Sequence, residues 1–268
     1  MLGAVVGDII GSPYEYANIK TTDFPLFSEG SRFTDDTVMT LATVRALMEC
    51  IPHHGDGTEE FDFKIVMFDS LRRLARGFPN AGYGKSFRAW LTAKDPHPYM
   101  SMSSAAAVRV SPVAWAFDDL ETVERFAELS ALITHINPEA VKGTIATAGA
   151  VFLARTEHGK DEIKEYLTCK YGYDLSRTLE EIRPDYEFDT SCPGLLPEAF
   201  TAFLEGENFE DVVRKAVSLG GSSATITAIA GSIAEPFFGI PTLIQVEAFD
   251  KLYPYLQYLT EKWEQWRN

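Results

Sequence analysis

The residues best suited to carry chemistry form one short run, Thr34-Asp35-Asp36, at the start of a segment with helical spacing. A hydroxyl and two carboxylates at one helix end provide hard oxygen ligands, which suit Mg²⁺. The same residues also suit the start of any helix, because Thr34 can cap free N–H groups and the two aspartates complement the helix dipole. This run alone leaves a metal site and simple helix capping open.

A second candidate is Glu15, which lies just beyond the break Gly11-Ser12-Pro13. The preceding run, residues 3–11, carries glycines four residues apart, and on a helix this spacing allows close approach to a neighbouring helix. Its apolar residues are also compatible with a short strand. The carboxylate of Glu15 could face a site, whereas a packed N-terminal helix without further role explains the same residues.

Two loops could bind an anion. At residues 219–225, a Gly-Gly pair ends one helix and serines open the next, which exposes backbone N–H groups that can cradle a phosphate. At residues 103–106, a small-residue turn leads into a helix that carries Arg109. An ordinary helix–helix corner and an ordinary helix start are the alternatives.

The elements that must position these segments are almost all helices. Periodicity and capping residues predict helices over residues 34–50, 59–76, 119–133, 138–155, 161–171, 208–219, 223–234 and 249–266. Residues 142–153 and 223–234 are rich in Ala, Gly, Ser and Thr, a composition typical of helices in the middle of a bundle. We therefore predict an all-α fold, with one compact domain over residues 1–268.

Composition excludes several classes of partner. The net charge of −15 leaves no basic surface for nucleic acid, and no apolar run approaches the roughly eighteen residues that a membrane span needs. The first eight residues lack the basic start of a signal peptide. Cys50, Cys169 and Cys192 are too far apart for a zinc motif or a disulfide framework. We expect a soluble, cytoplasmic protein.

Taken together and in order, these segments resemble the ADP-ribosylglycohydrolase family, which includes the dinitrogenase-reductase-activating glycohydrolases. The resemblance rests on GDIIGSPYE, FTDDTVMT, YGKSFRAWL, RVSPVAWAF, THINPEAVKG, YEFDTSCPG and SLGGSSATITAIAGSIAE. It implies a compact helical bundle around a central cleft that holds two Mg²⁺ ions and ADP-ribose. The implied reaction is hydrolysis of the N- or O-glycosidic bond between ADP-ribose and a side chain.

The resemblance also implies roles for single residues. Thr34, Asp35 and Asp36 match the first metal motif, and Thr225 matches the last ligand of the second. Glu15 matches an acidic residue near the scissile ribose, so that Glu15, Asp35 and Asp36 are the expected catalytic residues. The residues expected to bind the ligand are Ser103, Ser104, Ala105, Ala106, Arg109, His135, Phe188, Gly194, Ser222, Ser223 and Ala224.

The chain departs from the family's pattern on the segments that build the pocket. The second metal motif usually reads Gly-Gly-Asp-Ser-Asp-Thr, whereas residues 220–225 read Gly-Gly-Ser-Ser-Ala-Thr. Residues 103–106 read Ser-Ser-Ala-Ala in place of Gly-Asn-Gly-Ser. Residues 135–138 read His-Ile-Asn-Pro in place of His-Asn-His-Pro, and residues 192–194 read Cys-Pro-Gly in place of Cys-Gln-Gly.

These departures predict a loss of metal chemistry. A pair of Mg²⁺ ions needs carboxylates that neutralise its charge, and Ser222 and Ala224 supply none. We expect one weakly bound Mg²⁺ at most, or none. The leading interpretation is a protein that holds ADP-ribose, a cyclic relative or a similar nucleotide with catalysis impaired. A Mg²⁺-dependent ADP-ribosyl hydrolase with residual or altered activity and an interaction protein without a small-molecule ligand stay open.

Overall fold

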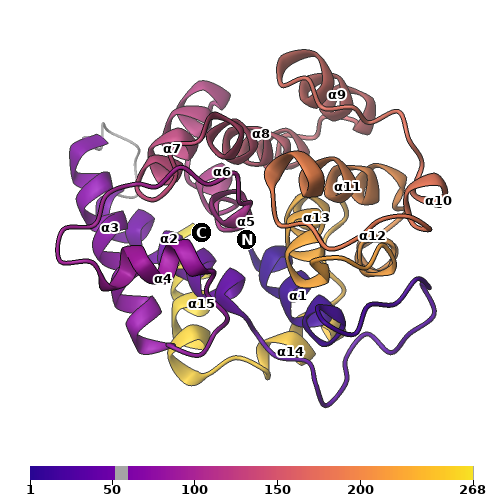
Figure 1. Cartoon of the computed structure of the whole chain (residues 1–268), viewed down its shortest axis with the longest axis horizontal. Helices are drawn as coiled ribbons and strands as arrows, with labels where there is room; N and C mark the ends of the chain where they lie inside the picture. The colour runs from indigo at the N-terminus through magenta and orange to yellow at the C-terminus, as the bar shows by residue number, and fades with distance from the viewer. Residues whose placement is uncertain (52–59, 268) are drawn as a thin grey trace.

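The computed structural model describes residues 1–51 and 60–267, and its regular structure is helical (Figure 1). No strand occurs in these residues, and isolated bridges join Tyr99 to His135 and Ser103 to Ser191. The predicted all-α class is confirmed. Within the same ranges, every helix is too short or too polar to pass through a lipid bilayer.

In chain order the elements are α1 (Leu2–Gly11), η1 (Ser12–Tyr14), α2 (Asp35–Cys50), α3 (Glu60–Gly77), α4 (Lys85–Thr92), α5 (Ala105–Val108), α6 (Val113–Ala116), α7 (Leu120–Leu132), α8 (Pro138–Arg155), α9 (Lys160–Glu165), η2 (Tyr166–Lys170), α10 (Leu179–Ile182), α11 (Cys192–Glu205), α12 (Phe209–Ser218), α13 (Ser223–Phe238), α14 (Thr242–Phe249) and α15 (Pro254–Arg267).

Most predicted helices are confirmed, and the differences have local causes. The glycine-rich start of the chain is the helix α1, which confirms the packed N-terminal helix and excludes the alternative of a short strand. The helix predicted over 249–266 begins later than expected: α14 ends at Phe249 and α15 begins at Pro254. A proline fits the first turn of a helix but not its interior. No prediction covered α4 or α11; α11 contains Pro197, which hides its helical pattern. Residue 59, predicted as helical, lies outside the described residues.

Helix α13 occupies the middle of the bundle and packs closely along α1. Figure 1 shows the two helices beside each other, with α2, α3 and α15 on one side and α11 and α12 on the other. A Cβ atom built on Gly7 would lie 2.2 Å from the carbonyl oxygen of Thr227, and one on Gly11 would lie 2.4 Å from that of Ser223. The small residues predicted for this contact are therefore required by the distance between the helices.

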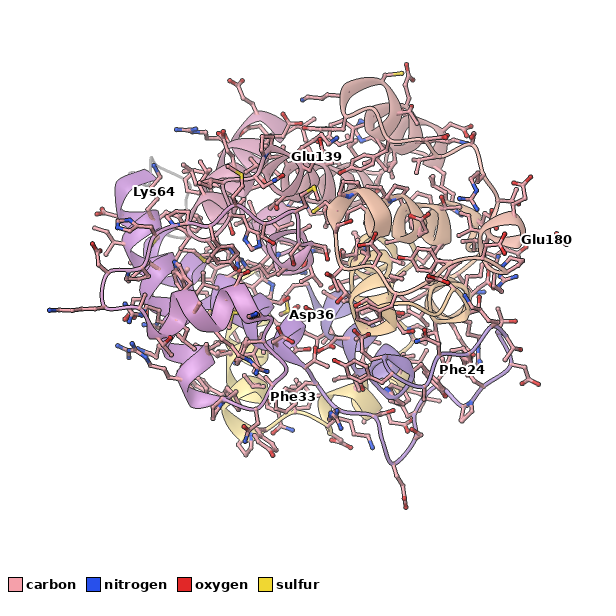
Figure 2. All side chains as sticks on the ribbon, viewed as in Figure 1. Phe24, Phe33, Asp36, Lys64, Glu139 and Glu180 are labelled. Atoms are coloured by element: carbon pink, nitrogen blue, oxygen red, sulfur yellow. The ribbon has the colours of Figure 1, made fainter. Side chains whose placement is uncertain are left out.

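This close packing brings three helix ends together. Asp8, near the end of α1, contacts the start of α2, and Gly11 lies against the start of α13. Asp36, in the first turn of α2, lies near the middle of the molecule in Figure 2. Polar groups from three distant segments therefore meet at one place inside the bundle.

The glycine contact predicts a specific loss of stability. In Gly7→Ala the new methyl group meets the backbone of α13, which can relieve the overlap only by moving α1 away, so we expect a loss of about 1–3 kcal/mol in the free energy of unfolding. Gly77→Ala is the matched control, because a Cβ there has no atom within 4 Å. Urea unfolding followed by tryptophan fluorescence measures both, and equal effects would contradict the packing.

Candidate functional site

The start of α2 is held by a buried carboxylate from α1. Asp8 accepts hydrogen bonds from the backbone N–H groups of Thr34 (2.8 Å) and Thr37 (3.2 Å) and from their hydroxyls (2.6 and 2.5 Å). Four donors offset part of the free-energy cost of burying this charge. Asp8 thus fixes α2 against α1. Sequence reasoning missed this role, and the signal was a lone aspartate in an apolar helix.

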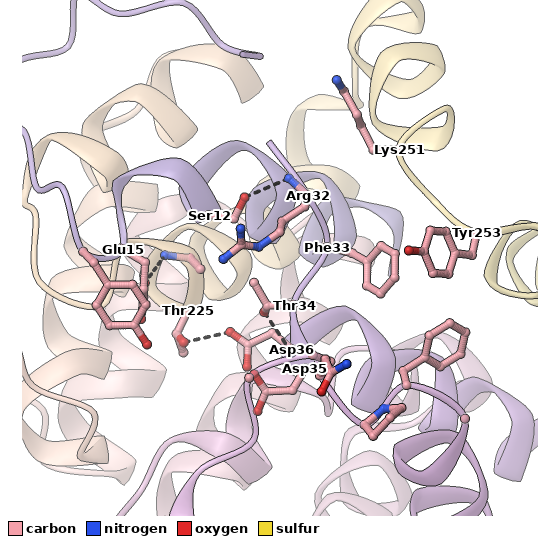
Figure 3. A pocket seen from close by; sticks show the side chains of 18 residues that line it. Ser12, Glu15, Arg32, Phe33, Thr34, Asp35, Asp36, Thr225, Lys251 and Tyr253 are labelled. Atoms are coloured by element: carbon pink, nitrogen blue, oxygen red, sulfur yellow. Dashed lines mark hydrogen bonds between the residues drawn. The ribbon is translucent and has the colours of Figure 1, made fainter. Parts of the chain in front are cut away.

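Thr34 caps α2 as predicted, because its hydroxyl oxygen accepts a hydrogen bond from the backbone N–H of Asp36 at 3.2 Å. The first turn then directs Asp35 and Asp36 into a cleft, where Figure 3 shows their carboxylates close together. From α13, the Thr225 hydroxyl donates to Oδ2 of Asp36 at 2.7 Å. The structure therefore brings together four residues that the sequence assigned to a metal site.

Glu15 binds the first turn of α13. Its Oε1 accepts a hydrogen bond from the Ser222 hydroxyl at 2.7 Å, and its Oε2 accepts one from the backbone N–H of Ala224 at 2.8 Å. This N–H group is one that the sequence assigned to a phosphate. A helix N-terminus attracts anions, and here the protein's own carboxylate already lies against it. A ligand phosphate would have to displace Glu15 to reach the same amide.

Asn18 holds the loop before α13. Its side chain accepts a hydrogen bond from the backbone N–H of Gly221 at 2.9 Å and donates one to the Gly221 carbonyl at 3.0 Å. Gly220 and Gly221 have φ angles of 72° and 64°, a region that favours glycine. Sequence reasoning missed Asn18, because nothing near it in the chain indicates a contact with residue 221.

The carboxylates of the cluster lie close together, with Asp36 buried and Glu15 and Asp35 half-buried. Burial and the neighbouring charge of Asp8 raise the pKa of Asp35 to about 7. Burial and the charge of Asp35 raise the pKa of Asp36 well above its ordinary value, and burial raises that of Glu15. Arg88 opposes the shift of Asp35 only weakly. The cluster therefore favours bound protons or a cation.

The cleft has two lobes that meet at this cluster, with volumes of about 440 Å³ for the first lobe and about 350 Å³ for the second. Both lobes are lined by Glu15, Tyr16, Asp35, Asp36, Gly82 and Thr225. The first lobe is completed by Ser12, Arg32, Phe33, Thr34, residues 77–81, Ala224, Lys251 and Tyr253. The second is completed by Met39, residues 83–87, Tyr99, Ser101, residues 103–105, Arg109, His135, Phe188, Thr190 and Ser222.

Most of the residues predicted to bind a ligand line one of the two lobes. Ala106, Ser223 and Gly194 are absent from both linings. Ala106 is buried behind the wall, and the Ser223 hydroxyl donates to the carbonyl of Tyr14. Gly194 lies against Asp189 at the start of α11. These three residues support the wall and do not form its surface.

The loop that contains Ser103 and Ser104 is already hydrogen-bonded. The backbone N–H and the hydroxyl of Ser104 both donate to the carbonyl of Thr190, at 2.8 and 3.1 Å. The Ser103 hydroxyl oxygen accepts from the backbone N–H of Ala105 at 3.2 Å. These bonds attach the loop to the segment before α11, and they engage groups that the sequence assigned to an anion.

Aromatic rings border both lobes. Phe188 stacks on Tyr16 with ring centroids 6.4 Å apart, and both side chains are exposed. In the first lobe, Phe33 meets the edges of Phe78 and Tyr253 (Figure 3). Sequence reasoning found Phe188 but not Tyr16 or Tyr253. Flat apolar surfaces at the mouth of a polar cleft suit a ligand that contains a planar ring.

The oxygen atoms around Asp35 and Asp36 are of the kind that Mg²⁺ prefers. Asp35 and Asp36, with the hydroxyls of Thr34 and Thr225, offer oxygen atoms from two facing helices, and these suit one ion. On the α13 side, Ser222 and Ala224 add no charge. Among the described residues, no group of three His, Cys, Asp or Glu side chains is arranged to hold a metal ion. These residues offer oxygen ligands to one cation, and α13 adds no carboxylate for a second.

Comparison with known proteins identifies the family and the fold. The model of the ADP-ribosylglycohydrolase family matches residues 1–253, and the chain therefore belongs to this family. A solved structure described as an ADP-ribosylglycohydrolase-related protein complex superposes with a TM-score of 0.70 at 22% identity, covering 100% of this chain and 96% of that one. That likeness shows the shared fold, and the family predicted from the sequence is confirmed.

Related sequences extend over most of the chain. An uncharacterised protein from Archaeoglobus fulgidus is 27% identical over 263 residues, which cover 87% of this chain and 84% of that protein. ADP-ribosylhydrolase ARH3 from Gallus gallus is 25% identical over 321 residues, covering 89% and 84%. ARH3 from Homo sapiens is 24% identical over 317 residues, covering 90% and 84%.

The buried cluster predicts a pH dependence of stability in EDTA. Folding raises the pKa of Asp35 from 3.8 to about 7, so the folded state binds more protons in this range, and stability falls as the pH rises through it. Asp35→Asn removes this effect. The stability of the variant relative to the wild type should therefore increase, on the order of 2 kcal/mol, from about pH 4 to about pH 8.

Glu181→Gln is a control of opposite sign. Hydrogen bonds from Thr178 lower the pKa of Glu181, so this carboxylate stabilises the folded protein at higher pH. Its variant should lose stability relative to the wild type as the pH rises. Urea unfolding across the pH range measures both variants, and a pH-independent difference for Asp35→Asn would contradict the account of the cluster.

Proposed function

We propose that this protein binds an ADP-ribose-containing or related nucleotide in the two-lobed cleft and hydrolyses glycosidic bonds far more slowly than active members of its family. The observation that carries the proposal concerns the first turn of α13. Ser222 and Ala224 stand there at the two positions where the family's second metal motif usually has aspartates. Because α13 itself contributes no carboxylate, Asp35, Asp36 and Glu15 supply too little negative charge to neutralise a pair of divalent ions.

We assign at most one weakly held Mg²⁺ to the oxygen ligands that remain. Asp35 and Asp36 would hold it, with Thr34 and Thr225 beside them. Such an ion supplies Lewis-acid polarisation of a bound oxygen. Glu15, the residue expected near the scissile ribose, is engaged by Ser222 and Ala224. Its carboxylate would have to leave these bonds before it could act as a base toward water.

The polar groups of the cleft support binding of a nucleotide. Arg109 lies in the wall of the second lobe, and Arg32 and Lys251 line the first, so each lobe contains a cation. The raised pKa values of Asp35 and Asp36 favour their neutral forms, which reduces their repulsion of a diphosphate bound in the cleft. The exposed rings of Tyr16 and Phe188 offer an apolar face to a base.

The second candidate is a Mg²⁺-dependent ADP-ribosyl hydrolase with residual or altered activity. It is favoured by the intact run Thr34-Asp35-Asp36 and by the hydrogen bond from Thr225 to Asp36, which keeps one side of a metal site assembled. In this case Glu15, Asp35 and Asp36 would carry the chemistry. The two candidates differ in whether the ligand needs Mg²⁺ and whether it is cleaved.

Restoring the two carboxylates tests the proposal. The wild type should bind ADP-ribose in EDTA, and its turnover of ADP-ribosylated serine or arginine should be at least about 10³-fold below that of an active family member. Ser222→Asp combined with Ala224→Asp adds charge beside Glu15 and Asp36. Binding in EDTA should then weaken about tenfold or more, and both binding and hydrolysis should increase when Mg²⁺ is added. Calorimetry and product release measure these quantities.

The matched control places the same two charges outside the cleft, as Ala89→Asp with Ser176→Asp, because both positions are exposed. This control should bind like the wild type. Wild-type turnover comparable with that of an active enzyme would refute impaired catalysis. Absence of wild-type binding to ADP-ribose, its cyclic isomers, cyclic dinucleotides and NAD would refute retention of these nucleotides.

A further inference from the structure

The wall of the second lobe contains a buried cation with unused donors. Arg109 is fully buried, and its Nη2 donates to the carbonyl of Ser130 at 2.8 Å and to the hydroxyl of Thr134 at 3.0 Å. Within the described residues, its Nε and Nη1 have no hydrogen-bond partner. Leaving buried charged donors unpaired costs free energy, so these N–H groups indicate a partner that comes from outside the chain.

Thr134 connects Arg109 to the imidazole of His135. An arginine can only donate, so the Thr134 oxygen accepts from Arg109, and the hydroxyl hydrogen stays available for another acceptor. The Nδ1 atom of His135 lies 2.7 Å from that oxygen. If Thr134 donates there, Nδ1 must be the unprotonated nitrogen. A neutral imidazole then carries its hydrogen on Nε2.

The surroundings hold His135 neutral and in place. Burial and the nearby charge of Arg109 lower the pKa of His135 to about 3, so the ring is neutral at physiological pH. Tyr99 fixes the backbone, because its N–H donates to the Thr134 carbonyl at 2.8 Å and its carbonyl accepts from Ile136 at 3.1 Å. The rings of Tyr99 and His135 lie 4.7 Å apart. Nε2 of His135 is buried and has no partner in the described residues.

We propose that Thr134 is a positioning residue that sets the tautomer of His135, so that the second lobe presents Nε2–H of His135 and the unpaired N–H groups of Arg109 to a phosphate oxygen of the ligand. These groups are all donors, so the part of the lobe beside them accepts an oxyanion and disfavours a ligand group that itself donates. The inference rests on the proposed nucleotide binding. It adds that the phosphate end of the ligand lies toward Arg109, away from Asp35 and Asp36.

The tautomer is measured first, in the ligand-free protein, by long-range ¹H–¹⁵N correlation spectra of the histidine rings. The wild type should show His135 protonated at Nε2. Thr134→Ser keeps the hydroxyl and should keep this spectrum. Thr134→Val removes the donor to Nδ1, and the spectrum should change toward a mixture of tautomers or the Nδ1–H form. A wild-type ring protonated at Nδ1, or a spectrum unaltered in Thr134→Val, would overturn the proposal.

Anion binding is measured second, with inorganic phosphate and acetate as probes. Phosphate should shift the Nε2 signal of the wild type and of Thr134→Ser, with apparent affinities within about threefold of each other, and should bind Thr134→Val about tenfold more weakly. A response to acetate alone would overturn the phosphate assignment, as would no response to either anion. ADP-ribose is titrated separately, so failure of nucleotide binding with an intact phosphate response would refute the proposed function and not this inference.

Discussion

The hydrogen bonds from Thr34 and Thr37 to the buried carboxylate of Asp8 are the contact on which the site depends. Asp8 reaches α2 because Gly7 and Gly11 let α1 lie directly against α13. The same packing places the first turns of α2 and α13 opposite each other. Asp36 and Thr225 can then form a hydrogen bond across the cleft.

This arrangement has an electrostatic consequence. Packing directs the carboxylates of Asp8, Glu15, Asp35 and Asp36 into one region, and burial raises the pKa of each. In a cleft built for two divalent ions, carboxylates on both walls are neutralised by the metal. Here the α13 wall contributes hydroxyl and methyl groups, and Glu15 occupies an N–H group at its helix end. The charge balance therefore favours protons or one cation over a metal pair.

Sequence reasoning predicted the parts of the fold that local pattern determines. The limits of α8, the caps Thr34 and Asn208, and the small residues of α13 follow from periodicity and capping chemistry. The absent carboxylates at residues 222 and 224 were visible as departures from a motif. A proline at the start of α15 and another inside α11 account for the helix limits that were mispredicted or missed.

Contacts between distant segments could not be predicted in this way. Nothing local to Asp8 indicates which helix it will contact, and Asn18 is separated from Gly221 by most of the chain. The bond from Ala224 to Glu15 turned an expected phosphate site into an internal contact. Such pairings depend on tertiary packing, which decides where a polar group finds its partner.

The central claim is that the cleft cannot support a metal pair, because α13 contributes no carboxylate. Calorimetric titration of Mg²⁺ into the metal-free protein tests this claim most directly. We expect one weak site at most, and Asp35→Asn should abolish whatever heat of binding the wild type shows. Two tight sites per chain would contradict the account, because they would require ligands on α13 that Ser222 and Ala224 do not provide.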